Sequence, residues 1–178
     1  MAGISREDRL AEILAKSLSE LLPELGVKAE RLSELAAPPP QGEGTVAFTG
    51  FASADLRGSF TLVGPTALFD RLHPLPVGVT PRDLADWARE LVNQAGGRFR
   101  SHLLDYGVSL ALGVPQSAPG EQARPSSRLR SERPPIAFAI EDMVLEGWLE
   151  LDMNPDFEIP EQPSAEQAAL QAGSVVFF

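Results

Sequence analysis

The sequence predicts an α+β domain in which a mostly antiparallel sheet carries helices packed on one face. Three observations lead to this fold class. A helical apolar pattern lies near the N-terminus, alternating segments that fit strands lie before and after the middle of the chain, and one long helical pattern lies between them. A strand hairpin, then a long helix, then further strands is typical of one sheet with helices on its face.

The first helix is expected over residues 5–22. Ser5 precedes Asp8 by three residues, which resembles a capping box with Asp in place of the commoner Glu. Pro23 and Gly26 are expected to end the helix. The apolar residues recur at helical spacing and form one stripe: Leu10, Ile13, Leu14, Leu18, Leu21 and Leu22.

Alternation of apolar and polar residues indicates the strands. Residues 44–63 are expected to form two strands joined by a turn, and residues 136–140 and 143–151 a second pair. A further strand is expected over residues 108–112. The segment 27–37 is ambiguous, with a short strand as one interpretation.

The chain is expected to form one domain over residues 1–152, followed by an acidic, proline-rich tail over residues 153–178 that is mostly disordered. Pro65 is expected to open a short helix over residues 66–72. The arginine-bearing segment 116–134 is interpreted as a solvated loop, with a docking loop for an acidic partner as the alternative.

Composition limits the classes of function. The 178 residues suit one domain, and the formal net charge of -10 disfavours binding to nucleic acid, whose phosphates repel an acidic surface. The chain has no cysteine and only two histidines, which excludes disulfides, thiolate metal sites and a histidine-rich zinc site. The N-terminus does not resemble a secretory signal, and no apolar run is long enough to span a bilayer. We therefore expect a cytoplasmic protein that binds neither nucleic acid nor membrane.

The longest helix is expected over residues 82–106. Thr80 fits its N-cap, Pro81 its first position and Asp83 its third. At about 100° per residue the apolar residues fall on one side, which must pack on the sheet. They are Leu84, Trp87, Ala88, Leu91, Val92, Ala95, Phe99, Leu103 and Tyr106.

Glu90 and Asn93 fall on the opposite side of this helix, where a spacing of three makes their side chains neighbours. Such a pair on an exposed helix face is usually only solvated. Gly96 and Gly97, however, each cost a helix roughly 1 kcal/mol relative to Ala. Either another backbone comes close to this face, or the helix bends or breaks there.

Residues 90–97 read Glu-Leu-Val-Asn-Gln-Ala-Gly-Gly and resemble the Glu-x-x-Asn-x-x-x-Gly motif of the CheC, CheX and FliY chemotaxis phosphatases. The expected order of elements over residues 5–152 is similar to that of the family as well. One copy of the motif, rather than two, resembles CheX. The resemblance implies a CheC/CheX-like fold.

The resemblance also implies a function in two-component and chemotaxis signalling. Members of the family hydrolyse the aspartyl phosphate of CheY-type response-regulator receivers, and the receiver supplies the Mg²⁺, so no cofactor of the chain's own is expected. By similarity Asn93 would orient the attacking water and Glu90 would pair with the receiver's active-site lysine. Gly97 would let the receiver approach. Arg89 stands where relatives often carry a small residue, and would either disturb docking or contact the acidic receiver.

Two other functions remain open at this point. The chain could be an adaptor that kept the CheX-like fold and binds a receiver without hydrolysing its phosphate. It could also be a structural homodimer built by pairing exposed strand edges.

Overall fold

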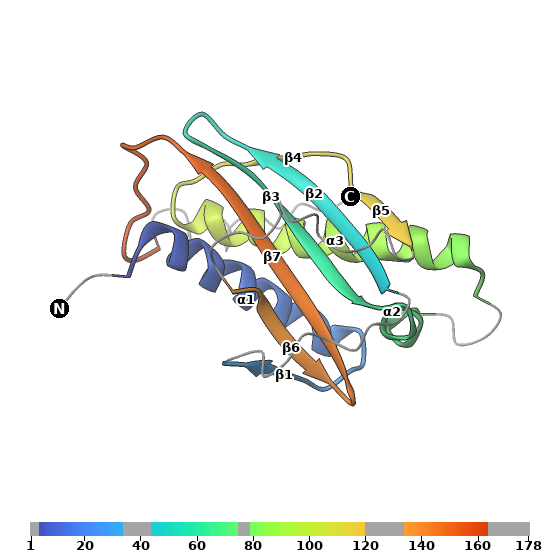
Figure 1. Cartoon of the computed structure of the whole chain (residues 1–178). Coiled ribbons are helices and arrows are strands. Elements are labelled where there is room, and N and C mark those ends of the chain that lie inside the picture. The colour runs from blue at the N-terminus through green and yellow to red at the C-terminus, as the bar shows by residue number, and fades with distance from the viewer. Residues whose placement is uncertain (1–3, 34–43, 75–78, 120–133, 164–178) are drawn as a thin grey trace, which may run out of the picture.

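The computed structural model describes residues 4–33, 44–74, 79–119 and 134–163, and it shows the expected α+β architecture (Figure 1). Three helices and one sheet make up this part of the chain. The helices are α1 (Arg6–Glu24), α2 (Thr66–Leu72) and α3 (Pro81–Asp105). The strands are β1 (Ala29–Leu32), β2 (Gly44–Ala52), β3 (Leu56–Pro65), β4 (Ala111–Leu112), β5 (Gln116–Pro119), β6 (Ile136–Ile140) and β7 (Met143–Met153).

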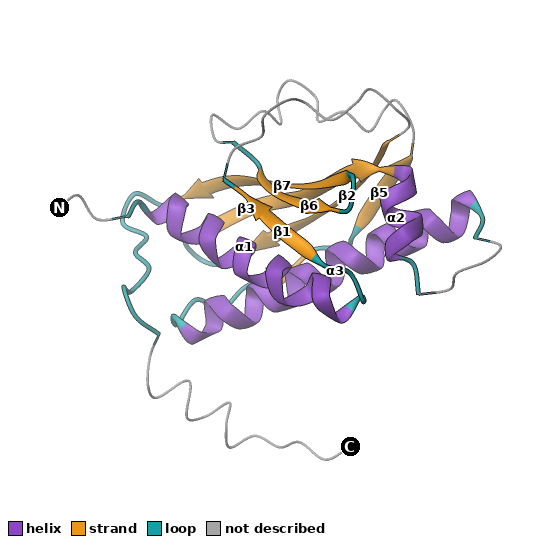
Figure 2. Cartoon of the chain, turned by 90° about the horizontal axis from the view of Figure 1, so that it is seen from below, coloured by secondary structure: helices purple, strands orange, loops and turns teal. Residues whose placement is uncertain are grey.

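All strand pairs in the described part of the sheet are antiparallel. The strand order is β1-β6-β7-β3-β2-β4, and β5 also pairs with β2. Figure 2 shows α1 and α3 together on one face of the sheet. The predicted fold class, a mostly antiparallel sheet with helices on a face, is therefore confirmed.

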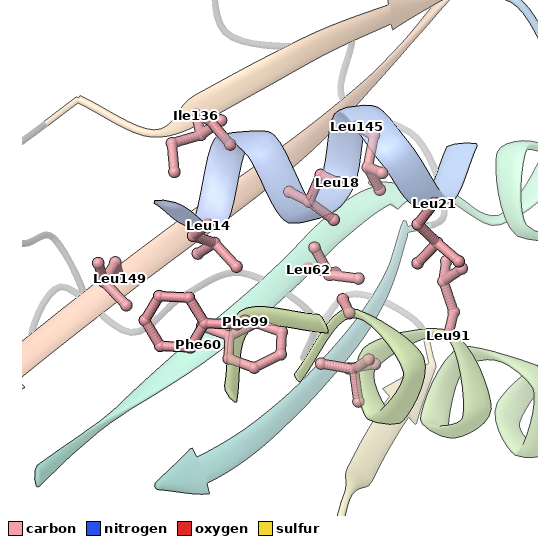
Figure 3. Packing of buried hydrophobic residues seen from close by; sticks show 14 of the residues in the cluster. Leu14, Leu18, Leu21, Phe60, Leu62, Leu91, Phe99, Ile136, Leu145 and Leu149 are labelled. Carbon is pink, nitrogen blue, oxygen red and sulfur yellow. The ribbon is translucent and has the colours of Figure 1, made fainter. Parts of the chain in front are cut away.

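The core lies between this sheet and the two long helices (Figure 3). The apolar stripe predicted on the first helix is buried along its whole length. On α3, Leu91 and Phe99 point into the same core, where they meet Phe60 and Leu62 of β3. Burial of one continuous apolar side of α3 leaves its other side facing solvent.

Both long helices begin at the predicted caps. The Ser5 side chain accepts a hydrogen bond from the Asp8 backbone N–H, 3.1 Å away. At the start of α3, Thr80 and Asp83 form a reciprocal capping box. The hydrogen bonds from Thr80 hold the pKa of the Asp83 carboxyl below its usual value. At its other end α1 includes Pro23 in the last turn. The helix ends at Glu24, slightly later than expected.

The prediction of a strand over residues 108–112 is mostly wrong. Only Ala111–Leu112 pairs with β2, and Gln116–Pro119 forms a second short strand on β2 within the segment expected to be a loop. The prediction thus contained β4 but made it too long, and it missed β5, because strands of 2 and 4 residues are too short for a clear periodic pattern. The remainder of the arginine-bearing segment, residues 120–133, lies outside the described residues.

Residues 154–163 also differ from the expected disordered tail. Phe157 is buried in the core, and the Arg6 guanidinium donates hydrogen bonds to the backbone oxygens of Pro155 and Phe157 at 2.7 and 2.6 Å. Arg9 donates likewise to the Pro160 oxygen at 2.6 Å. Buried apolar surface and charge-assisted hydrogen bonds thus hold this stretch against α1. Residues 164–178 lie outside the described residues.

Candidate docking and catalytic surface

The exposed side of α3 carries both residues of the predicted catalytic pair. Glu90 and Asn93 are exposed, while Leu91 and Val92 between them are buried. The long helix therefore holds the carboxylate and the amide one turn apart, facing solvent, on a backbone that is fixed to the sheet. The Asn93 side chain makes no hydrogen bond within the described part of the chain, so its amide is free to bind a partner or a water.

The Glu90 carboxylate is held by a neighbour on the same helix. The Gln94 side-chain amide donates a hydrogen bond to Glu90 Oε1 at 2.8 Å. A carboxylate held this way needs less ordering when it meets a cation than a freely rotating one does. This contact is an i, i+4 pair, so the spacing of Glu90 and Gln94 in the sequence could have indicated it.

The two glycines of the motif have different roles. α3 continues through both, so the helix does not break there. A Cβ on Gly96 would lie 3.2 Å from the Phe60 ring and 3.4 Å from Leu112, so Gly96 allows α3 to pack closely on the sheet. A Cβ on Gly97 would meet no heavy atom within 4 Å. Packing within the described chain does not require glycine at position 97, and the approach of a receiver predicted there stays a prediction.

Replacement of Gly97 tests this interpretation. Gly97→Ala is expected to raise the free energy of unfolding by about 0.5–1 kcal/mol, because alanine restricts the unfolded chain and favours the helix. If a receiver approaches this position, the same methyl group weakens receiver binding by roughly three- to tenfold. Chemical denaturation and titration with a receiver measure the two effects. The control is Ser19→Ala at an exposed position of α1, which should leave binding unchanged. Wild-type receiver affinity in Gly97→Ala would contradict close approach at this position.

Arg89 lies beside the pair but is engaged within the chain. Its guanidinium forms an ion pair with Asp86 on the same helix and lies 3.5 Å from Ser117 Oγ on β5. Ser117 in turn donates a hydrogen bond to the Ala85 backbone oxygen at 2.8 Å. Arg89 thus takes part in joining β5 to α3. The docking role predicted for it stays a prediction. No local pattern in the sequence indicates Ser117, because its contact with α3 depends on the position of β5.

No group of three histidine, aspartate or glutamate side chains among the described residues could hold a metal ion. A hollow of about 680 Å³ lies over the ends of β2, β3 and β7, and its lining includes none of Arg89, Glu90, Asn93 and Gly97. None of the helices in the described ranges is both long and apolar enough to cross a bilayer.

Comparison with known proteins identifies the fold. No protein-family model matches the chain, and no curated protein matches it by sequence. Solved structures do match. A CheX chemotaxis protein from Vibrio vulnificus superposes with a TM-score of 0.60 at 16% identity, covering 80% of this chain and 99% of its own. A CheC-like protein from Shewanella oneidensis gives a TM-score of 0.62 at 13% identity, covering 80% of this chain and 97% of its own.

A third match comes from a complex. CheX from Borrelia burgdorferi, solved with CheY, BeF₃ and Mg²⁺, gives a TM-score of 0.52 at 13% identity and covers 84% of this chain and 99% of that one. Identities this low establish the architecture alone. The chain therefore has the fold of the CheX and CheC-like chemotaxis proteins.

Proposed function

We propose that this protein is a phosphatase that removes the aspartyl phosphate from a CheY-type response-regulator receiver in two-component signalling. One observation carries the proposal. A carboxylate and an amide project one turn apart from the exposed side of α3, in a chain with the CheX fold. The same two residues begin the motif that resembles that of the CheC, CheX and FliY phosphatases.

In this proposal Asn93 orients the water that attacks phosphorus. Phosphoryl transfer depends on a positioned nucleophile and on electrostatic stabilisation more than on a strong base. A neutral amide suits that task because it can both donate a hydrogen bond to water and accept one. It also places no negative charge beside the phosphoryl oxygens. The free side chain of Asn93 is consistent with this role.

Glu90 fixes the docking geometry by pairing with a cationic side chain of the receiver, which the family resemblance identifies as the active-site lysine. Gln94 already holds the Glu90 carboxylate in place. The receiver would supply the Mg²⁺ for the reaction. The complex in which Borrelia burgdorferi CheX was solved contains CheY, BeF₃ and Mg²⁺, which supports a receiver as the class of partner.

A phosphate-release assay tests the proposed function against the two alternatives. The protein is mixed with a panel of phosphorylated receivers, and phosphate release is compared with that from each receiver alone. Faster release supports the phosphatase. Binding with an unchanged phosphate lifetime indicates the adaptor. Absence of binding to every receiver, with a dimer detected by sedimentation, indicates the structural homodimer.

Glu90→Ala is expected to weaken receiver binding by about tenfold, because the ion pair with the receiver's lysine is lost. Titration with a beryllofluoride-activated receiver measures the loss. Glu30→Ala is the matched control, because Glu30 is an exposed glutamate on β1, at the far edge of the sheet from β4. If Glu90→Ala binds as tightly as the control, the role assigned to Glu90 is wrong.

A further inference from the structure

An exposed apolar side chain lies on the same side of α3 as the catalytic pair. Leu104 is 40% exposed. It follows Gly97 by seven residues, or about two helical turns, so it continues the face of α3 that carries Glu90 and Gly97. An apolar residue in line with the catalytic pair is a candidate contact for whatever that pair meets.

A second exposed apolar side chain, Val114, belongs to the segment between β4 and β5. Its exposed fraction of 82% is the largest given for any large hydrophobic side chain in the described ranges. The chain on either side of it contacts α3. Leu112 lies against Gly96, and Ser117 donates a hydrogen bond to the backbone oxygen of Ala85. Val114 lies between these two contact points.

Asn93 occupies the side of α3 along which this segment runs. It follows Arg89 by four residues and precedes Gly96 by three, so all three lie along one side of the helix. Arg89 and Gly96 are the positions that face Ser117 and Leu112. Val114 therefore belongs to the short segment that joins the two contacts with this side of α3, and Leu104 lies further along α3 itself.

A β-bulge presents Val114. The edge of the sheet pairs Leu112 with Phe51 and Gln116 with Phe48. Between these pairs, residues 113–115 oppose only two residues of β2. One extra residue on one strand defines a bulge, a feature that often redirects side chains next to functional sites.

Hydrogen bonds fix the bulge. The Gly113 N–H donates to the Gly50 oxygen at 2.8 Å, and the Thr49 hydroxyl donates to the Gly113 oxygen at 3.1 Å. A Cβ on Gly113 would lie 3.3 Å from the Gly50 oxygen, so the two backbones approach closely. The backbone at Val114 is therefore already ordered, and a partner that covers this side chain causes little further loss of conformational entropy.

We propose that Leu104 and Val114 are the apolar contacts of the receiver-docking surface and bury against the receiver's surface around its phosphorylated aspartate. The proposal rests on the proposed function and adds the contacts that select the partner. Leu104 follows Glu90 by 14 positions along the helix, or about 21 Å. That span fits one side of a protein–protein interface and is far larger than a free phosphate ester needs.

Serine variants test the proposal with a beryllofluoride-activated receiver and Mg²⁺ as the probe. Val114→Ser and Leu104→Ser are each expected to raise Kd by roughly five- to twentyfold, because the apolar burial is lost. In the phosphate-release assay the loss is expected in KM rather than in kcat. The control is Ile4→Ser, which removes another exposed apolar side chain (68% exposed), located just before α1, and should leave Kd unchanged.

The outcomes separate this inference from the proposed function. If both serine variants bind like the control while Asn93→Ala strongly slows hydrolysis, the apolar contacts are refuted and the phosphatase stands. If the wild-type protein binds no receiver, both are overturned. Both side chains are exposed, so their loss should leave the fold intact. Circular dichroism of each variant checks this, and a variant with an unchanged spectrum shows that its change in Kd reflects docking.

Discussion

Asn93→Ala is expected to slow phosphate release from a phosphorylated receiver on the order of 100-fold, the usual effect of losing one positioned group in a transition state. Binding should change little, because Glu90 and the rest of the exposed side of α3 remain. Asn93 is exposed, and its side chain makes no hydrogen bond within the described chain, so its loss should not disturb the fold. Single-turnover phosphate release and receiver titration measure the two quantities separately.

The control for Asn93→Ala is Gln162→Ala, which removes an exposed amide from the stretch that follows β7. It should hydrolyse phosphate at the wild-type rate. A wild-type rate in Asn93→Ala as well would refute the assigned role of the amide.

Asn93→Asp distinguishes an oriented water from a general base. The replacement has nearly the same shape but places a negative charge where the phosphoryl oxygens would lie. We expect hydrolysis to fall at least as far as in Asn93→Ala, because the carboxylate repels the phosphate and can no longer donate to water. Full activity in Asn93→Asp would show that a carboxylate can do the chemistry and would contradict the amide mechanism.

Phe99→Ala is expected to lower the free energy of unfolding by about 3–5 kcal/mol, the range for removing a buried aromatic side chain. Phe99 is fully buried and lies edge-on to two other rings. The centroid distances are 5.5 Å to Phe51 on β2 and 6.4 Å to Phe60 on β3. Its loss leaves a cavity where α3 meets the sheet. Urea unfolding monitored by circular dichroism measures the effect.

Two further variants serve as comparisons for the loss of stability in Phe99→Ala. Phe99→Leu keeps most of the apolar volume and should cost less than Phe99→Ala. Arg100→Ala alters the next residue, which is exposed, and should change stability by no more than about 0.5 kcal/mol. A Phe99→Ala protein as stable as Arg100→Ala would contradict the packing of α3 on the sheet described above.

Local sequence signals were enough to predict much of this protein. The capping residues Thr80 and Asp83 and the helical period of α3 act over a few residues, so the helix and its two faces could be read without tertiary information. The exposure of Glu90 and Asn93 follows from that period. The fold class followed from the order of the elements, and the expected hairpin over residues 44–63 formed as β2 and β3.

Contacts between segments distant in the chain determined the features that local sequence patterns did not predict. Gly96 and Gly97 are identical in sequence, and only the approach of Phe60 and Leu112 separates the packing glycine from the open one. The bulge at residues 113–115 depends on the register with β2, which no local pattern encodes. The fixed position of residues 154–163 depends on Arg6 and Arg9, which precede that stretch by almost the whole length of the domain.

The sequence by itself determined which residues of α3 face solvent, because helical periodicity is a property of consecutive residues. Only the tertiary structure decided what borders them. The short edge strands are too small to be stable alone, and they take their positions from β2 and from α3. Their placement sets Leu112 against Gly96 and Ser117 against Arg89, while the position of Gly97 stays open.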